Sequence, residues 1–481
     1  METANKNRWL ILLIVVMFPF MACLDGSIVN VALPTIANQL GVSMAAISWV
    51  VSIYLITITA LILLFGRLGD ILGTVRIFRL GVLLFLLGSL LCGLTNSYSL
   101  LLASRALQAV GGAATAATNQ GIITQTFPPG ERGRALGING TFVALGSMAG
   151  PPLGGLIISY FHWHNIFLIN IPIGLIFFCL GLKYLPKQIR ERRGKLDYAG
   201  AALLISSLTL LFYGLSSSQN AGFSQIIIIA SILGGILLLT GFILWERESP
   251  HPLLDLTIFR NRLFSLSLIC AFLAFMAVYS LNIIQPFYLE EVLGLPPRTT
   301  GLLLMTFPLV ASVIAPISGY LSDKIGSELL TAIGFILTAT GLFLLSSLKE
   351  TLALASIIVF IGLTSLGSSM FQSPNTSLIM SSVPRDKVGV AGSINALARN
   401  LGMVLGVLFA TSILYNRMSS KIGAPTLGYV QGQASAFIYG MSWAYKSAAC
   451  LCILGATLTT WRLLKRSATA RRKKQKERSR N

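Results

Sequence analysis

Charged residues are scarce in this chain. Only 11% of its 481 residues are charged, whereas 54% are hydrophobic, and the mean hydropathy is +0.77. A water-soluble globule of this size needs far more polar surface. The composition therefore excludes a soluble protein and indicates one that is solvated by lipid, with no polar stretch long enough for a soluble domain.

Clusters that hold metals or perform catalysis are also lacking. The chain has three histidines and six cysteines, and each cysteine stands in an apolar run without His or Cys at metal-ligand spacing. The cysteines are therefore interpreted as packing residues. No phosphate-binding loop, HExxH sequence or other catalytic constellation occurs. We therefore expect that the chain is not an enzyme and binds no cofactor and no metal. Without a phosphate-binding loop of its own, it would need a second chain to act as an ATP-driven pump.

Long apolar runs are abundant. A bilayer core of roughly 30 Å needs about 20 apolar residues per helix, so the length allows about fourteen spans. The expected spans are residues 9–31, 47–65, 77–94, 100–122, 135–160, 166–185, 198–215, 225–245, 264–289, 301–321, 330–348, 352–379, 388–414 and 444–463. The first run lacks a small-x-small cleavage site, so we expect it to remain as a span. The predicted fold class is an all-α membrane protein.

Basic residues predict the orientation. The formal net charge is +20, and with the N-terminus in the cytoplasm only seven of the 36 Lys and Arg fall outside the inner segments and the tail. Five of these seven are external, and Arg105 and Arg399 are embedded. Both termini are therefore predicted to be cytoplasmic. The tail, with RRKKQKERSR at 471–480, is interpreted as an anchor for anionic lipid headgroups and not as a nucleic-acid site.

An internal repeat predicts two related halves. Residues 66–73 (GRLGDILG) and 319–326 (GYLSDKIG) share the form G-x-L-x-D-x-x-G. The aspartates of the two copies, Asp70 and Asp323, are 253 residues apart. That interval is too long for six spans with short loops, but it fits eight spans. We therefore expect an N-terminal half at 1–197, two extra spans at 198–245, a C-terminal half at 246–463 and a basic tail at 464–481.

Asp25 is the most informative single residue. It stands in LDGSIVNVALP at 24–34, and at about 1.5 Å per residue it lies roughly 24 Å along the first span from Trp9. A carboxylate at that depth is costly when ionised, so we expect it to bind a proton or a cation. Arg105, in the fourth span, should reach a similar depth. The pair either exchanges protons during transport or forms a static link between helices.

The fifth span carries glycines at intervals of four, at Gly146, Gly150 and Gly154, with Pro151 among them. Such glycines line one helical face and let a second backbone approach closely, and Pro151 permits a bend. Taken alone, the pattern also fits ordinary packing of membrane helices.

These stretches together resemble the major facilitator superfamily, and within it the fourteen-span branch of drug:proton antiporters. Residues 24–34 are similar to the branch's first-span motif, 105–112 (RALQAVGG) to R-x-x-Q-G with Ala109 in place of Gly, 146–155 to G-x-x-x-G-P-x-x-G-G, and 163–172 (WHNIFLINIP) to W-R-W-I-F-x-I-N-x-P. The resemblance implies a major facilitator fold of two six-helix halves plus two central helices. It also implies export of small amphipathic compounds in exchange for protons by alternating access.

The resemblance implies roles for particular residues. Asp25 would take the proton and Arg105 would tune it, whereas the two repeat loops would brace a cytoplasmic gate. The expected gate and conformational residues are Arg67, Asp70, Gly73, Asp323, Gly146, Gly150, Pro151 and Gly154. For the loops the alternative is a turn that only sets topology.

Polar or amphipathic side chains in the apolar spans are candidates for a substrate cavity, although each also suits helix packing. They are Asn30, Trp49, Tyr54, Gln108, Asn282, Gln285, Gln372, Asn375 and Arg399.

The expected partners are a small-molecule substrate, protons and a bacterial cell membrane. Three alternatives remain: an exporter of a specific metabolite or lipid, an uptake symporter, and a membrane receptor that keeps the fold without transport. Asp25 is the one acid expected deep in the membrane, which disfavours export of multivalent cations with several protons.

Overall fold

The computed structural model describes residues 7–42, 44–47, 49–186, 196–221, 225–249, 253–254, 256–350, 354–384, 387–424, 426, 430 and 432–478. Some helical residues in these ranges, including all of 465–478, are described by their backbone alone. The basic tail from 465 onward is among the residues without described side chains, so its predicted binding of lipid headgroups lies outside the described residues. So do the roles assigned from the sequence to three single residues, Asn30, Pro151 and Asp323.

The described chain consists of helices and short connections, and no strand occurs in it. The N-terminal helices are α2 (Arg8–Leu40), α3 (Met44–Ile47), α4 (Trp49–Leu72), α5 (Thr74–Leu94), α6 (Tyr98–Thr126), η1 (Pro129–Glu131), α7 (Arg132–Tyr160), α8 (Asn165–Leu168) and α9 (Asn170–Tyr184). The others are α10 (Tyr198–Ala221), α11 (Ile226–Glu248), η2 (Leu256–Arg260), α12 (Arg262–Phe287), η3 (Tyr288–Val292), α13 (Pro297–Leu304), α14 (Thr306–Ile325), α15 (Ser327–Leu345), α16 (Leu354–Ser381), α17 (Val388–Ile422) and α18 (Ala434–Arg478).

Fourteen described segments are long and apolar enough to cross a membrane, and each coincides with a predicted span. The predicted class of all-α membrane protein is confirmed. Two spans are broken helices, formed by α8 with α9 and by α13 with α14. Several helices extend beyond the predicted boundaries: α2 ends at Leu40 and not at 31, α17 ends at Ile422 and not at 414, and α18 begins at Ala434 and not at 444.

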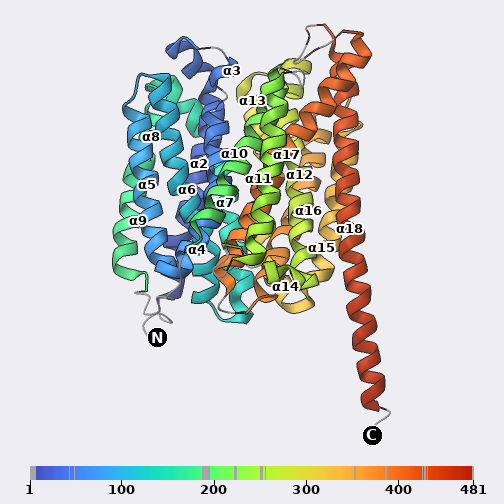
Figure 1. Cartoon of the computed structure of the whole chain (residues 1–481). Coiled ribbons are helices and arrows are strands. Elements are labelled where there is room, and N and C mark those ends of the chain that lie inside the picture. The colour runs from blue at the N-terminus through green and yellow to red at the C-terminus, as the bar shows by residue number, and fades with distance from the viewer. Residues whose placement is uncertain are drawn as a thin grey trace.

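The helices form two groups that lie side by side (Figure 1). Helices α2, α5, α6 and α9 lie on one side, and α12, α15, α16 and α18 on the other. Within the first group α2 packs on α7 and α5 on α6, and the second group repeats this with α12 on α17 and α15 on α16. The groups meet where α14 contacts α7 and where α17 contacts α4 and α6.

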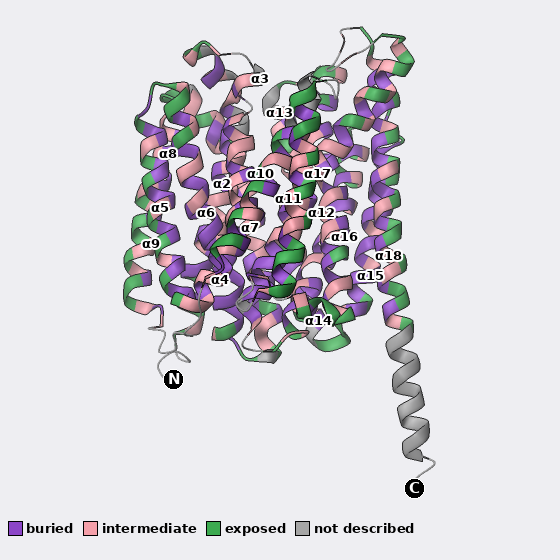
Figure 2. Cartoon of the chain, viewed as in Figure 1, coloured by how far each residue is buried: buried purple, intermediate pink, exposed green. Residues whose placement is uncertain are grey.

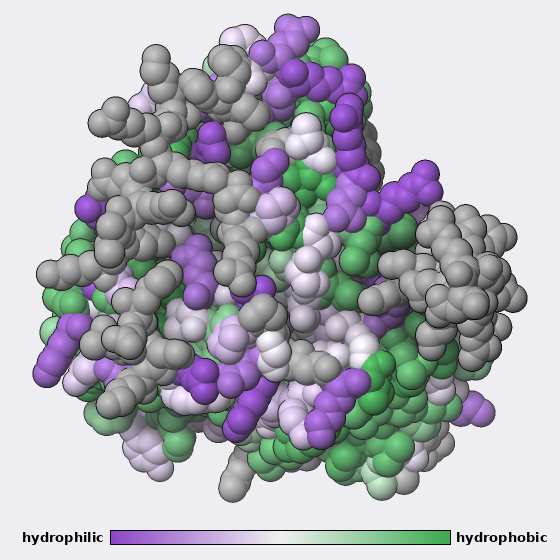
Figure 3. Space-filling model, turned by 90° about the horizontal axis from the view of Figure 1, so that it is seen from below, coloured by the Kyte–Doolittle hydropathy of each residue, from purple (hydrophilic) through white to green (hydrophobic). Residues whose placement is uncertain are grey.

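The start of α2 and the end of α18 lie toward the same end of the bundle, called the lower end here (Figure 1). Figure 3 shows hydrophilic residues gathered on this end and hydrophobic residues on the flanks. Figure 2 shows exposed residues in green along the outer helices. Large apolar side chains are among the exposed ones, such as Leu94 (66% exposed), Leu237 (73%) and Phe343 (60%). A surface of this kind suits lipid and not water. That the lower end faces the cytoplasm stays a prediction.

Prolines inside two helices are compensated by hydroxyl groups from neighbouring helices. A proline lacks an N–H and leaves the carbonyl four residues earlier without its helical donor. Pro374 in α16 frees the Met370 carbonyl, to which the Ser318 hydroxyl donates at 3.0 Å. Pro316 in α14 frees the Ser312 carbonyl, which accepts from the Thr141 hydroxyl of α7 at 3.1 Å. The second of these bonds joins the two halves.

The two extra helices, α10 and α11, pack against each other, and α10 also contacts α4 and α17. The ring of Trp49 on α4 lies 5.7 Å from that of Tyr213 on α10. The pair therefore covers the junction of the two halves beside α4 and α17. The division of the chain at residues 197 and 246 stays a prediction.

Candidate functional site

The predicted pair of Asp25 and Arg105 is present in the structure. Arg105 Nη1 on α6 donates to Asp25 Oδ2 on α2 at 2.6 Å, and each residue is 1% exposed. A charge-assisted hydrogen bond of this length is strong, and removing one partner would leave the other charge buried without compensation. The pair is therefore a highly constrained feature of the N-terminal half.

Two buried amides complete the surroundings of the Asp25 carboxylate. Gln108 Nε2 donates to Asp25 Oδ1 at 3.0 Å and to the Ser89 hydroxyl at 2.7 Å, and Asn170 Nδ2 donates to Asp25 Oδ1 at 2.9 Å. Arg105 Nη1 also donates to Gln108 Oε1 at 2.6 Å. Three donors from two helices thus converge on one carboxylate. The sequence analysis gave no role to Ser89 or Asn170, although Asn170 stands at the Asn position of the motif at 163–172.

Arg105 also joins α4 to this cluster. Its Nε donates to the Val50 carbonyl at 3.2 Å, and its guanidinium carbon lies 4.4 Å from the centre of the Tyr54 ring and 5.6 Å from that of Phe167. Aromatic faces attract a cation and help to hold a guanidinium away from water. Tyr54, predicted to line a cavity, instead lies against Arg105 with its buried hydroxyl lacking a hydrogen-bond partner. The ion pair therefore holds α2, α4, α6 and α9 together.

The close packing of α5 on α6 makes the Ser89–Gln108 bond possible. A Cβ added at Gly88 of α5 would meet the backbone nitrogen and Cα of Gln108. Only a glycine allows the two backbones to approach so closely. This approach places the Ser89 hydroxyl within reach of the Gln108 amide.

The glycines of the fifth span pack α7 onto the helix that carries Asp25. A Cβ at Gly146 would meet the Phe20 carbonyl, one at Gly150 would meet Ser27, and one at Gly154 would touch Ile28. The Ser27 hydroxyl also donates to the Ser147 carbonyl at 3.0 Å. The predicted close approach along this face is therefore present, and its partner is α2 on both sides of Asp25.

The first glycine of each repeat loop touches the opposite half. A Cβ at Gly66 would clash with the Ser393 side chain of α17, and one at Gly319 would clash with the Gly133 carbonyl of α7. The last glycines, Gly73 and Gly326, have φ of 105° and 95° and directly precede α5 and α15. Side chains other than hydrogen rarely tolerate that conformation. The repeat thus marks two equivalent contacts that close the lower end.

The polar members of the first repeat loop lie beside these contacts. Asp70 and Arg67 are both partly buried at the end of α4. Asp70 has an interaction partner, whereas Arg67 Nε is buried without a hydrogen bond. The bracing role predicted for both residues stays a prediction.

Asp197, just before α10, fastens the end of the extra pair. Its carboxylate accepts hydrogen bonds from the Gly200 N–H at 2.8 Å, the Trp245 indole at 2.8 Å and the Ser249 hydroxyl at 2.9 Å. Burial alone would raise the pKa of Asp197, but these hydrogen bonds outweigh burial and lower the pKa below its ordinary value of 3.8. The group is therefore ionised at neutral pH and ties α10 to α11.

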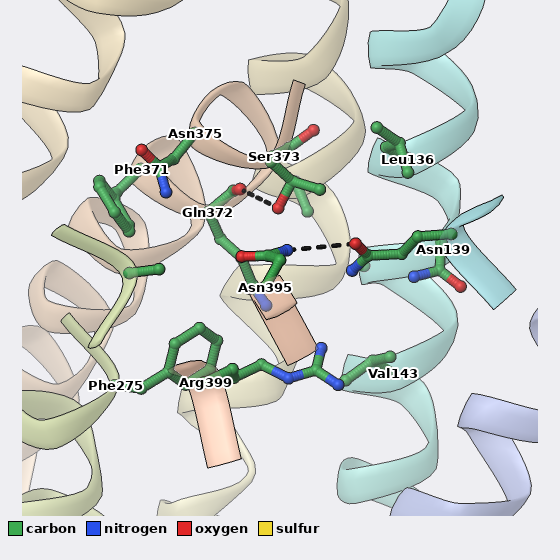
Figure 4. A pocket seen from close by; sticks show the side chains of 15 residues that line it. Leu136, Asn139, Val143, Phe275, Phe371, Gln372, Ser373, Asn375, Asn395 and Arg399 are labelled. Carbon is green, nitrogen blue, oxygen red and sulfur yellow. Dashed lines mark hydrogen bonds between the residues drawn. The ribbon is translucent and has the colours of Figure 1, made fainter. Parts of the chain in front are cut away.

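A polar cavity lies between the halves, lined by 15 residues from α6, α7, α12, α14, α16 and α17 (Figure 4). Of the predicted cavity residues, Gln372, Asn375 and Arg399 line it. The centre of a water molecule can occupy about 30 Å³ of it, which is room for roughly two waters. The cavity must widen before it can hold an organic molecule.

The other predicted cavity residues lie elsewhere. Gln108 belongs to the ion-pair cluster, Trp49 faces α10, and Asn282 is exposed on α12. Gln285 is buried and accepts from the Tyr445 hydroxyl at 2.8 Å. Polar lining residues that sequence reasoning missed are Gln120, Asn139, Ser373, Thr376 and Asn395.

The family profile described as Major Facilitator Superfamily matches residues 15–407. The chain belongs to the major facilitator superfamily. Proteins of this superfamily are membrane transporters, and with fourteen spans and bacterial relatives this member is a multi-pass protein of a bacterial cell membrane.

Several curated members of the superfamily are similar over most of their length. The chain is 37% identical over 464 residues to the riboflavin transporter RibZ of Clostridioides difficile, covering 95% of this chain and 98% of the relative. It is 30% identical to the multidrug resistance protein Stp of Mycobacterium tuberculosis (87% and 78% covered) and 31% identical to the tetracenomycin C resistance and export protein of Streptomyces glaucescens (86% and 77% covered).

Solved structures of the superfamily share the fold at low sequence identity. The human organic anion transporter MFSD10 (TETRAN) matches with a TM-score of 0.65 and 15% identity, covering 93% of this chain and 98% of its own. The proton:xylose symporter XylE also matches at 0.65, with 14% identity and coverage of 95% and 96%. At this identity the likeness shows the major facilitator fold alone.

Proposed function

We propose that this transporter exports small organic molecules in exchange for protons by alternating access, with Asp25 as the residue that binds the proton. The observation that supports this role is the buried cluster in which Arg105, Gln108 and Asn170 converge on the Asp25 carboxylate. A carboxylate buried among membrane helices is costly and is a functional site by default. Arg105, Gln108 and Asn170 all donate hydrogen bonds to this carboxylate, so its protonation would disturb each of these bonds.

Protonation of Asp25 would weaken the attraction that holds Arg105. Because Arg105 contacts α4 and Asp25 lies on α2, loss of the ion pair loosens α2 from α4 and α6. Helix α7 packs along α2 on both sides of Asp25 and contacts α14 of the other half. A shift of α2 is therefore transmitted through α7 to the contact between the halves. That contact is a bistable element of the kind that alternating access needs.

The contacts at the lower end define which state the structure represents. Gly66 against Ser393, Gly319 against Gly133 and Thr141 against Ser312 all join the halves. If the lower end is cytoplasmic, as the basic residues predict, this state is closed to the cytoplasm.

The similarity to named resistance and export proteins supports export. The multidrug resistance protein Stp, the methyl viologen resistance protein SmvA of Salmonella typhimurium and the tetracenomycin C exporter all align over at least 85% of this chain. All three names state resistance to one or more compounds, and the third also states export. Export of amphipathic compounds is therefore proposed over uptake.

A second candidate is transport of riboflavin or a similar metabolite. It is favoured by the 37% identity to RibZ, which extends over 95% of this chain and 98% of that protein. No other relative named above combines that identity with that coverage. The two candidates share the proton-coupling cluster and differ in the cargo.

Transport by purified protein in liposomes tests the proton-coupled role. With an imposed pH gradient, the wild type should concentrate its substrate, whereas Asp25→Asn should lose this active transport and keep passive exchange of substrate, since exchange needs no net proton movement. Glu131→Gln is the control, because Glu131 pairs with Arg8 near the surface at 3.1 Å. Normal gradient-driven transport by Asp25→Asn would rule out the proposed role.

The same preparation separates the alternatives from the proposal. A symporter would take up protons together with its substrate, whereas an antiporter moves the two in opposite directions, so the sign of the internal pH change distinguishes them. A receptor that keeps only the fold would bind a ligand and show no flux.

A further inference from the structure

The cavity between the halves contains polar atoms without partners. Asn139 Oδ1 on α7, Asn375 Oδ1 on α16 and Arg399 Nε on α17 are each buried and lack a hydrogen-bond partner. Asn139 is 8% exposed and Asn375 is 1% exposed. Buried groups of this kind are nearly always hydrogen-bonded, so each exception needs an explanation. Three exceptions in one cavity point to a molecule that binds there.

The charge of the cavity is positive. None of its 15 lining residues is acidic, and Arg399 is its one ionisable cation. No carboxylate in the described part of the chain forms an ion pair with Arg399, whose guanidinium carbon lies 5.9 Å from the centre of the Phe275 ring. Figure 4 shows the Arg399 side chain extending from α17 toward Val143 on α7. Arg399 is therefore free to meet an acceptor or an anion inside the cavity.

The three unpartnered atoms define what such a molecule must offer. Asn139 Oδ1 and Asn375 Oδ1 are acceptors and need N–H or O–H donors, whereas Arg399 needs a carbonyl or an anionic group. Phe275 and Phe371 also line the cavity and present apolar ring surface. Water can fill these needs in the empty transporter, and a substrate of matching chemistry replaces it.

We infer that the cavity selects a planar, neutral or anionic heterocycle that carries both carbonyl acceptors and N–H or O–H donors, and that it rejects organic cations. This inference rests on the proposed transport function and names its substrate class. A quaternary dication such as methyl viologen has no N–H or O–H, so it leaves both amide oxygens unpaired. It also meets Arg399 without a compensating carboxylate. Riboflavin has the required imide, hydroxyl groups and planar ring.

This selectivity distinguishes between relatives that share the fold. The relatives include both the riboflavin transporter RibZ and the methyl viologen resistance protein SmvA, and the latter is 29% identical over 87% of this chain. The cavity places this chain with the first of these two by chemistry as well as by identity.

The experiment compares four compounds in proteoliposomes that contain the purified full chain. Riboflavin and riboflavin 5′-phosphate represent the inferred class, whereas methyl viologen and ethidium are planar cations. For wild-type protein we expect transport of at least one flavin with a kcat/KM at least about tenfold above that of either cation. Transport of the cations with a higher kcat/KM than both flavins would overturn the inference and leave the proposed function intact. Failure to move any of the four would count against the proposed function itself.

Variants assign the selectivity to this cavity. Asn139→Leu, Asn375→Leu and Arg399→Gln should each raise the KM for the flavin about tenfold or more, since each removes one bond made to the substrate. Asn139→Leu also removes an unpartnered buried oxygen, so its Tm should not fall. A role that is only structural would instead lower the Tm and leave the KM unchanged, and that result overturns the inference.

Matched controls lie farther along α17. Asn416 is exposed, and the guanidinium carbon of Arg417 lies 4.3 Å from the centre of the Trp443 ring, away from the cavity. Asn416→Leu and Arg417→Gln should keep the wild-type KM. A tenfold rise in the KM of these controls would show that any substitution on α17 disturbs transport. The effects of the cavity variants could then not be assigned to substrate contacts in the cavity.

Discussion

The two halves of the molecule treat their embedded arginines in opposite ways. In the N-terminal half, Arg105 meets Asp25 at 2.6 Å, a backbone carbonyl and an amide, all of them buried. In the C-terminal half, Arg399 has no described acidic partner and lies at the edge of a polar cavity. The charge of Arg105 is therefore compensated within the protein, whereas we infer that Arg399 interacts with a bound substrate. One repeated architecture can therefore hold an internal switch in one half and a recognition group in the other.

Removing each arginine is the strongest way to test this contrast. Arg105→Ala leaves Asp25 buried without its cation and should destabilise the folded protein by about 3–5 kcal/mol. Arg399→Ala should cost much less, because it breaks no ion pair between described residues. Thermal unfolding in detergent measures both. Equal losses for the two variants would show that the halves do not differ in this way.

The two repeat glycines should differ in how they can be repaired. Gly319→Ala forces a Cβ onto the Gly133 carbonyl, and overpacking of this kind typically costs about 1–3 kcal/mol. Gly66→Ala meets mainly the Ser393 side chain, so Ser393→Gly should relieve it. Hydrogen–deuterium exchange of α7, α14 and α17 reports the opening of the lower end. We expect Ser393→Gly to restore the closed lower end in Gly66→Ala. No side-chain substitution can do the same for Gly319→Ala, because the clash there is with a backbone carbonyl.

The hydrogen bond across the halves at Pro316 should have a smaller effect. Thr141→Val removes the donor to the Ser312 carbonyl and should weaken the closed state by about 1 kcal/mol. Faster amide exchange in α14 would reveal it. Thr240→Val is a matched control, since the Thr240 hydroxyl donates only to the Ile236 carbonyl of its own helix. An identical change in both variants would mean that the bond across the halves has no special weight.

The smallest effect is expected at Asp197, at the end of the extra pair. Because hydrogen bonds lower its folded pKa below 3.8, its stabilisation is full above that value and is lost as the pH falls through the lower folded pKa. Asp197→Asn should therefore reduce the Tm slightly at pH 7, and the difference from wild type should shrink as the pH falls below about 4. A difference that grows on acidification would contradict the direction of this shift.

The sequence predicted the spans and the Asp25–Arg105 pair, because apolar runs have a definite length and an embedded charge demands a partner. It did not predict the cavity well. Asn282 and Asn375 are both amides in apolar helices, yet Asn282 is exposed and Asn375 is buried in the cavity. The rotation of each helix about its axis decides such cases, and that rotation depends on tertiary packing.

Packing also explains the residues that sequence reasoning missed. Asn139 and Gln120 lie on α7 and α6, where small residues dominate and the hydrophobic pattern does not single out one face. Asn395 Nδ2 donates to Gln120 Oε1 across the halves at 3.1 Å. Contacts of this kind join positions 275 residues apart, and no local pattern contains them.

The central claim is that Asp25 gains and loses a proton, and infrared difference spectroscopy of the purified protein tests it most directly. The carboxylic C=O band that appears on acidification is recorded for wild type and for Asp25→Asn, with Glu131→Gln as the control for other carboxyl groups. The account predicts a band in the wild type and in Glu131→Gln that Asp25→Asn lacks. Identical bands in wild type and Asp25→Asn, from acid pH to neutral, would contradict it and leave the ion pair as a static link between helices.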